Sequence, residues 1–307
     1  MEILVNNEPI QFALEGEDNL GQVVNQLQEW LLDNRLTISG LVVDGNDLPL
    51  YAPERWNTHP LGNVSNVSVT ASTYREMKLS TFQTILQYVV LLHNGIEERR
   101  YADLKELLAE YRYIRKSLID LIGPVRPELG ELRLDDLLDR SGLLEGRQVD
   151  DEEREGLLVH LKNLQFLVID RMKEITQPEQ EAAFAAVLLQ QTIPEISEVS
   201  LLLQTGKDRE AMAAVVRFTE LLGKVIRIVP YVYESNPAIR ERVTDGKSLA
   251  DVTGDLNRFL NELVDAFTAQ DSVLIGDLLE YEVAPRVQQV VTLLADDPLS
   301  PAQEPPS

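Results

Sequence analysis

The sequence of 307 residues contains no cysteine. Disulfides, thiolate zinc sites and cysteine nucleophiles are therefore excluded. Histidine is scarce too: none of His59, His93 and His160 stands in the Glu-x-x-His pattern of di-iron carboxylate bundles. A hydrolase needs a base such as histidine beside its nucleophile, and nothing in the sequence indicates such a pair. We therefore expect no catalytic residue, no metal and no cofactor.

Basic residues are few, with 28 Lys plus Arg against 51 Asp plus Glu and a net charge of −23. Nucleic acids and anionic membrane surfaces are both bound through basic residues, so neither is an expected partner. An acidic surface steers basic molecules toward itself. The composition favours a protein partner that is basic or amphipathic, although a solvated acidic surface without any partner has the same composition.

Long apolar runs are missing as well, since no window approaches 18 uninterrupted apolar residues. The opening MEILVNNEPIQF has no basic segment followed by an apolar one, which a secretory signal needs. We expect no membrane span and a cytoplasmic location. Gly206-Lys207 is not a phosphate loop, because Leu201 replaces the earlier glycine and Asp208 would repel phosphate.

Short β-type runs and turn residues dominate the first 72 residues. The runs Ile3–Val5 and Ile10–Leu14 flank Asn6-Asn7-Glu8-Pro9, which predicts a hairpin. Apolar residues at helical spacing follow from Leu20 to Leu31, with Asp18 or Asn19 as the N-cap.

A second hairpin is predicted from Leu41 to Leu50 around the turn Asp44-Gly45-Asn46-Asp47. Val64, Val67 and Val69 then supply a last strand.

This order of elements resembles the ubiquitin-like β-grasp family, from MEILVNN through LVVDGNDLPL to NVSVTA. The resemblance covers residues 1–72 and rests on element order and size. It implies a recognition module, because β-grasp domains often bind partners through the open face of the sheet; the alternative is a small domain that packs on the helices. The segment lacks lysine and a terminal Gly-Gly, so conjugation is not implied.

Residues 73–297 predict an α-helical domain of antiparallel hairpins, because apolar residues recur at spacings of three and four. Asn94-Gly95 is the expected end of its first helix. Residues 123–149 contain two prolines and four glycines and are expected to form a hinge-like connection. Residues 298–307 are a Pro-rich tail with the composition of a disordered segment. The overall fold class is therefore α+β.

The segment Leu201–Val229 is the most informative part of this helical region. Its second helix carries a narrow packing stripe. The stripe consists of Met212, Val215, Thr219, Leu222, Ile226 and Val229. In the preceding helix Phe184, Val187 and Leu188 are expected to face inward. Pro194 and Pro285 are expected to kink or divide their helices.

Pro230 to Pro237 is expected to break the helix and to expose Tyr231 and Tyr233, our candidate partner-binding residues. Asp150, Ser248, Asp208 and Asp271 are expected N-caps. The last two occupy corresponding turns, so either a degenerate duplication or the convergence of similar hairpins explains the pattern.

These observations favour a non-catalytic adaptor, scaffold or chaperone-like protein of a bacterial-type cytoplasm. One specific version holds a secretion or flagellar export client, by analogy with acidic helical export chaperones. The alternative is a hydrolase or transferase whose carboxylates meet at the junction of the two domains. The 51 acidic residues leave that alternative open.

Overall fold

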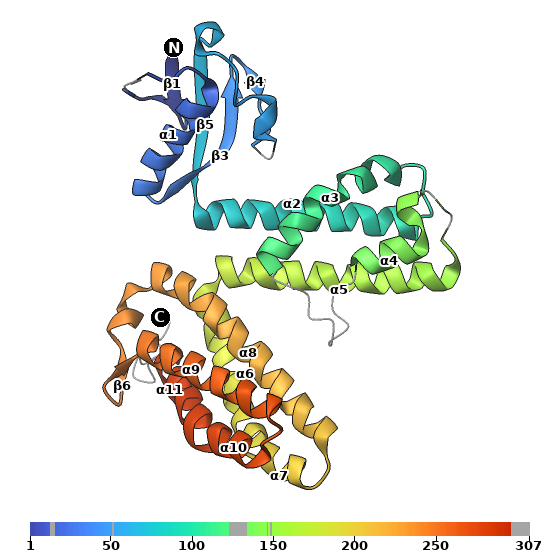
Figure 1. Cartoon of the computed structure of the whole chain (residues 1–307), viewed down its shortest axis with the longest axis vertical. Helices are drawn as coiled ribbons and strands as arrows, with labels where there is room; N and C mark the ends of the chain where they lie inside the picture. Colours follow the sequence, from blue (N-terminus) through green and yellow to red (C-terminus); the bar gives the residue numbers. More distant parts are fainter. Residues whose placement is uncertain (13–15, 51, 123–133, 146, 148, 296–307) are drawn as a thin grey trace, which may run out of the picture. The chain divides into compact units, whose positions relative to one another are not determined.

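The computed structural model describes residues 1–12, 16–50, 52–122, 134–145, 147 and 149–295. It confirms the α+β class, with a mixed sheet first and helices after it (Figure 1). The chain divides into two compact units, Met1–Ile169 and Asp170–Ser307. The domain boundary expected after residue 72 stays a prediction. The expected tail at 298–307 and much of the 123–149 connection lie outside the described residues.

The five-stranded sheet has the order β2-β1-β5-β3-β4. Its central pair β1 and β5 is parallel, and the other neighbours are antiparallel. The elements are β1 (Glu2–Val5), β2 (Glu8–Pro9), α1 (Leu20–Asp33), β3 (Leu36–Val43), β4 (Asn46–Asp47), the 3-10 turns η1 (Pro53–Arg55) and η2 (Leu61–Asn63), and β5 (Asn66–Thr73). Alternate residues of the strands are buried against α1, whose N-cap is Asn19.

Both hairpin turns have left-handed central residues. Asn6 and Asn7 have φ values of 52° and 65°, and Asp44 and Gly45 have 48° and 80°. These are the values of two-residue turns that match the twist of the strands. The second turn is therefore tighter than expected, and β4 is only Asn46–Asp47. In the same way β2 ends at Pro9, before the strand expected from Ile10.

The helices of the first unit begin directly after β5. They are α2 (Tyr74–Glu97), α3 (Leu104–Ile122), α4 (Leu134–Ser141), the 3-10 turn η4 (Leu143–Glu145) and α5 (Asp151–Thr176), whose last turns belong to the second unit. Contrary to expectation, α2 continues through Gly95. A Cβ there would lie 2.3 Å from Leu104 Cδ2, so this glycine allows the start of α3 to approach α2 closely.

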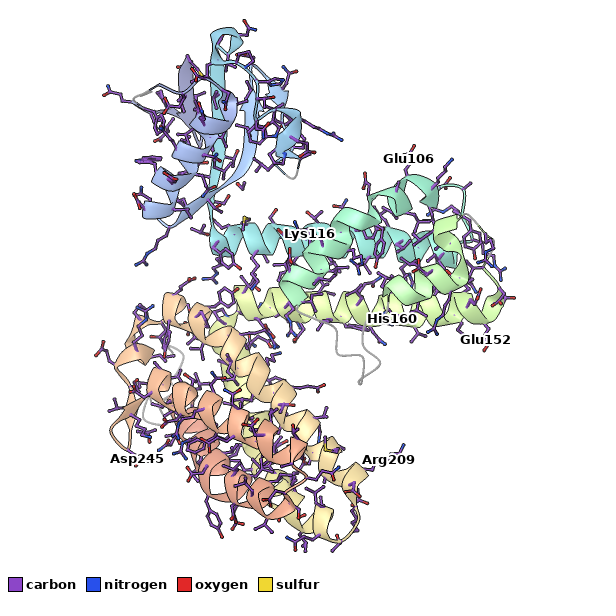
Figure 2. All side chains as sticks on the ribbon, viewed as in Figure 1. Glu106, Lys116, Glu152, His160, Arg209 and Asp245 are labelled. Carbon is purple, nitrogen blue, oxygen red and sulfur yellow. The ribbon has the colours of Figure 1, made fainter. Side chains whose placement is uncertain are left out.

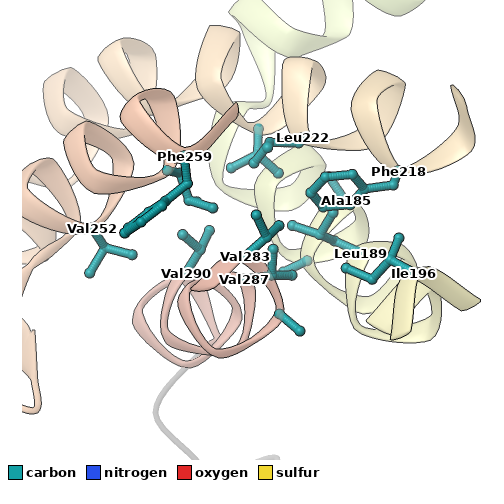
Figure 3. Packing of buried hydrophobic residues seen from close by; sticks show 14 of the residues in the cluster. Ala185, Leu189, Ile196, Phe218, Leu222, Val252, Phe259, Val283, Val287 and Val290 are labelled. Carbon is teal, nitrogen blue, oxygen red and sulfur yellow. The ribbon is translucent and has the colours of Figure 1, made fainter. Parts of the chain in front are cut away.

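The second unit is helical apart from one small hairpin. It comprises α6 (Pro178–Ser197), α7 (Val199–Gln204), α8 (Asp208–Ser235), the 3-10 turn η5 (Pro237–Glu241), β6 (Val243–Thr244), β7 (Lys247–Ser248), α9 (Leu249–Thr268), α10 (Ser272–Asp277), the π-helical segment η6 (Leu278–Val283) and α11 (Ala284–Leu294). One hydrophobic core joins α6, α8, α9 and α11 (Figure 3).

Three of the four N-caps that we expected in the helical region are confirmed by hydrogen bonds. Asp150 accepts from the Glu153 amide, Asp271 accepts from the Leu274 amide, and Ser248 forms a capping box. Asp208 is not a cap, since α8 begins at Asp208 itself and no side chain caps it. One of the features shared by the two turns is therefore missing, which weakens the argument for duplication.

The chain stays helical through Pro194 and Pro285, and the expected kinks at these prolines stay predictions. Helix α6 includes Pro194 and ends only at Ser197. Before Pro285 the chain forms the π-helical η6, and α11 then starts at Ala284. Pro285 thus lies in the first turn of α11, where a missing N–H leaves no intrahelical hydrogen bond unmade.

The predicted stripe of α8 is confirmed at Val215, Leu222 and Val229 and is wrong at Met212 and Ile226. Leu222 is 1% exposed, and Val215 and Val229 are buried, whereas Met212 and Ile226 are 43% and 42% exposed. The buried face of α8 also contains residues that our predicted stripe omitted, namely Ala211, Phe218, Val225 and Val232.

The contrast within this stripe predicts different costs for similar truncations. Leu222→Ala should reduce the free energy of unfolding by about 2–5 kcal/mol, because it leaves a cavity in the core. Ile226→Ala should cost less than about 1 kcal/mol, because its side chain is already half in solvent. Denaturant unfolding of both variants measures the difference, and equal costs would contradict the observed orientation of α8.

Candidate protein-binding face

The helix α6 exposes apolar side chains on its outer face. Phe184 and Val187 are each 58% exposed, although we expected them to face inward with Leu188, which is half-buried. Gln180, Gln191 and Pro194 are exposed too. These five positions follow one another at spacings of four and three, so they form a single stripe along the helix.

Alanine explains this orientation of α6. The residues that α6 buries include Ala182, Ala185 and Ala186, and α8 buries Ala211 and Ala214 in the same core. Alanine projects only a Cβ, so two helices that meet through alanine can approach closely. Figure 3 shows Ala185 and Leu189 of α6 beside Phe218 of α8. The larger Phe184 and Val187 are left on the outside.

The neighbouring helix α11 extends this surface. Pro285, Gln288, Thr292 and Ala295 are exposed at spacings of three and four. The side-chain amide of Gln190 on α6 donates to Gln288 Oε1 at 2.8 Å, so the two helices lie side by side here.

We call this surface the uncharged face. It comprises Phe184, Val187, Gln190, Gln191 and Pro194 of α6 with Gln288, Thr292 and Ala295 of α11. No ionisable residue occurs between Ala182 and Pro194 or between Val287 and Ala295, in a chain whose net charge is −23. Interfaces between proteins are depleted of charge at their centres, so this face has the composition of one.

Ion pairs at the inner side of α6 fix its rotation. Lys224 Nζ of α8 lies 2.7 Å from both Asp170 Oδ1 of α5 and Glu181 Oε2 of α6. Burial lowers the pKa of Lys224, but its hydrogen bonds to the two carboxylates outweigh that effect and raise the pKa overall. Farther along, Arg217 of α8 binds Glu195 of α6 at 2.8 Å. With α6 held at both ends, its apolar stripe remains outside.

The end of α5 is attached to the same helices through a buried carboxylate. Glu174 is buried and accepts hydrogen bonds from Arg171 at 2.6 Å and from Arg227 of α8 at 3.1 Å. Burial lowers the pKa of Arg171, although the Glu174 carboxylate opposes that shift. A buried charge without a partner is costly, so the ion pairs with Arg171 and Arg227 offset the loss of solvation of the Glu174 carboxylate.

The structure does not place Tyr231 and Tyr233 on an exposed surface. Helix α8 continues through Pro230 to Ser235, so the expected break is absent at this point. Tyr231 is 8% exposed, and the half-buried ring of Tyr233 packs against the core with the Arg240 guanidinium 5.1 Å from its centre. Packing on both sides of Pro230 keeps the helix intact, and their partner-binding role stays a prediction.

The sheet of the first unit has a second surface of interest. On the side away from α1, Leu4, Ser68 and Val42 form a row across β1, β5 and β3, and all three are half-buried. Ser39 and Ser72 hydrogen-bond to each other at 2.8 Å on the neighbouring strands. This open face is small and mostly polar, so it offers less apolar anchoring than the uncharged face.

The titratable groups of the described residues do not form a metal site. No group of three or more histidines and carboxylates stands close enough together there to hold an ion. Three carboxylates have a clearly lowered pKa. Hydrogen bonds from Thr73 to Glu76, from Ser248 to Asp251 and from Lys247 to Asp255 hold these groups ionised. Each shift is explained by a helix cap or an ion pair.

The three histidines differ in their exposure to solvent. His93 lies 3.8 Å from Glu97 near the end of α2, and His59 is exposed. His160 on α5 is half-buried (Figure 2), and its buried Nε2 finds no hydrogen-bond partner among the described residues. Burial lowers the pKa of His160, because the charged imidazolium loses solvation there.

Comparison with known proteins gives two partial family matches. A model described as the TP0873 N-terminal domain matches residues 1–73, which end with β5. A model described as Domain of unknown function (DUF8042) matches residues 184–292, from Phe184 in α6 to Thr292 in α11. No curated protein and no solved structure matches the chain significantly. Neither description states an activity, and each match covers less than half of the chain.

Within the described part of the chain, none of the helices combines the length and hydrophobicity that crossing a lipid bilayer requires.

The sequence does contain a signal for the uncharged face, which our interpretation missed. The eight residues from Ala182 to Leu189 are all apolar. A helix at the surface of a domain buries only a stripe, so a run of this length must expose some of its members. When the neighbouring helix also contains alanines at the contact, the small residues of such a run indicate its buried side.

The orientation of α6 predicts opposite responses at adjacent positions. Ala185→Leu should cost at least about 1–3 kcal/mol of stability, because Ala185 is fully buried and the added side chain would force α6 away from α8. Phe184→Ala should cost less than about 0.5 kcal/mol. Thermal or denaturant unfolding of both variants provides the measurement; a larger loss for Phe184→Ala would show that α6 is rotated.

The buried imidazole of His160 predicts a dependence of stability on pH. Because the pKa of the folded state is lowered, the unfolded chain takes up a proton first as the pH falls through the ordinary value of about 6.5. The free energy of unfolding should therefore fall between about pH 7 and pH 5, and His160→Gln should lose less over that range. An unchanged slope in His160→Gln would assign the dependence to other groups.

Proposed function

We propose that this chain is a non-catalytic adaptor or scaffold of the cytoplasm, and that the uncharged face is its docking surface for protein. The observation that carries the proposal is the pair of exposed side chains Phe184 and Val187 within a surface free of ionisable groups. Contiguous exposed apolar side chains on a soluble helical unit commonly mark interaction sites. Aromatic residues are enriched at the centres of such interfaces.

The charge of the chain supports protein as the partner class. Nucleic acid would require a basic surface, and the 28 basic residues are outnumbered by 51 acidic ones. Two basic residues of α8 that pair with α6 are already engaged, because Lys224 and Arg217 bind carboxylates. The uncharged face itself offers apolar contacts and amide hydrogen bonds.

We further propose that residues 1–73 act as a recognition module of the ubiquitin-like β-grasp type. The strand order and the single helix against one face of the sheet support this assignment. Residues 1–72 contain ten acidic and two basic residues, Arg35 and Arg55. A basic partner would be steered toward this module at low ionic strength.

A display library of random peptides tests the docking role of the uncharged face. Peptides with apolar anchors should be enriched on the full chain. Their affinity should fall at least about 30-fold on the double variant Phe184→Ser, Val187→Ser, which is the loss expected when central anchors are removed. Isothermal titration calorimetry of selected peptides gives the affinities.

Val264→Ser is the matched control, because Val264 is equally exposed on α9 but lies beside Asp265. It should leave peptide binding unchanged. Both variants replace exposed side chains, and circular dichroism should show the same helix content as in the wild type. The proposal fails if no peptide is enriched, or if the peptides bind the double variant as well as they bind the wild type.

A further inference from the structure

We infer that the occupant of the uncharged face is a second copy of this chain, joined through α6 and α11 about a two-fold axis. The inference rests on the proposed docking role of this face and names its partner. In a two-fold interface a surface patch meets its own counterpart, so a patch that carries a net charge repels its copy. In a chain with a net charge of −23, a patch without ionisable residues meets its copy without that repulsion.

Val264 and Tyr281, two other exposed apolar residues of the second unit, fail this condition. Val264 lies beside the exposed Asp265, and Tyr281 lies between Glu280 and Glu282. The negative charge of Glu280 raises the pKa of Tyr281, because it disfavours ionisation of the neighbouring phenol. Self-association through either residue would bring carboxylates together. The uncharged face combines exposed apolar side chains with a wide stretch free of acids.

The spacing of the exposed residues also suits helix pairing. On α6 the positions Gln180, Phe184, Val187, Gln191 and Pro194 alternate at spacings of four and three, and α11 shows the same alternation from Pro285 to Ala295. This is the repeat by which one helix packs along another over several turns. Two adjacent helices with such outward stripes would form a four-helix layer with their counterparts.

Glutamine provides the self-complementary polar contacts. A carboxamide both donates and accepts hydrogen bonds, so two copies of one glutamine can bond to each other where two carboxylates could not. Gln190 and Gln288 demonstrate this pairing within one chain at 2.8 Å. Gln180 and Gln191 are exposed on the same stripe as Phe184 and Val187. A basic partner, by contrast, would find no carboxylate on this face.

Sedimentation velocity of the full chain tests the inference from about 1 µM to about 300 µM, a range that covers weak and moderate dimers. The wild type should shift from monomer to dimer. Val187→Glu and Thr292→Glu, on different helices of the face, should each raise the dissociation constant at least about 30-fold. Val264→Glu should leave it unchanged, as should the conservative Val187→Ile.

Salt provides an independent readout. The two copies repel each other through their net charge, and salt screens that repulsion over the Debye length of about 8–10 Å. Association through an uncharged face should therefore strengthen as ionic strength rises. Association that weakens with salt would indicate ion pairs and would overturn the inference.

Other outcomes of the sedimentation experiment also overturn it. A wild type that remains monomeric at the highest concentration does so, and so does an equal loss of dimer in Val264→Glu. If the wild type is monomeric but a chain ending at Ala295 dimerises, the residues after Ala295 occupy the face instead. If the chain is monomeric and selected peptides still require Phe184 and Val187, the docking role stands and its partner is a different protein.

Discussion

The close packing of α6 against α8 determines what the second unit presents to solvent. Because Ala182, Ala185 and Ala186 form the contact side of α6, the helix must turn its larger apolar residues outward. If Phe184 and Val187 formed the contact side instead, α6 would lie farther from α8 and its alanines would be exposed to solvent. Burying the small residues keeps Leu189, Phe218 and Leu222 in one dense core, at the expense of an exposed phenylalanine and valine.

The ion pairs of Lys224 with Glu181 and of Arg227 with the buried Glu174 make this arrangement specific. Desolvation offsets much of the attraction between charges that are removed from water, so such pairs add little to stability on balance. Leaving the buried carboxylate of Glu174 unpaired would cost far more than its ion pairs contribute. A rotation of α6 or α8 would separate their partners. The pairs therefore act against alternative helix orientations, which alanine contacts alone would specify poorly.

Local chemistry in the sequence predicted much of the fold. The Asn6-Asn7 and Asp44-Gly45 turns, the caps Asn19 and Ser248 and the order of strands and helices all depend on residues close together in the chain. Our predictions were wrong where a contact with a residue elsewhere in the fold determines the local structure. Gly95 continues a helix because Leu104 approaches it, and Pro230 lies within α8 because Tyr231 and Val232 are packed beyond it.

The candidate site depends most on contacts between residues that are far apart in the sequence. The apolar run from Ala182 to Leu189 shows that some side chains must be exposed, but it does not say which. The choice follows from the alanines of α8, which are placed by a separate stretch of sequence. We predicted that Tyr231 and Tyr233 would be exposed because Pro230 suggested a break in the helix. Packing of the residues around Pro230 keeps the helix intact and covers these tyrosines instead.

Charge and its local absence have complementary effects in this chain. An excess of 23 negative charges opposes contact between copies over most of the surface and so limits association to places where carboxylates are missing. The exposed residues of α6 and α11 form such a place, and their glutamines supply polar contacts without adding charge. Charge repulsion elsewhere then improves the selectivity of the uncharged face, because every competing arrangement of two acidic chains costs more. A weakly apolar surface can thus be a specific one, provided that the remainder of the molecule is strongly acidic.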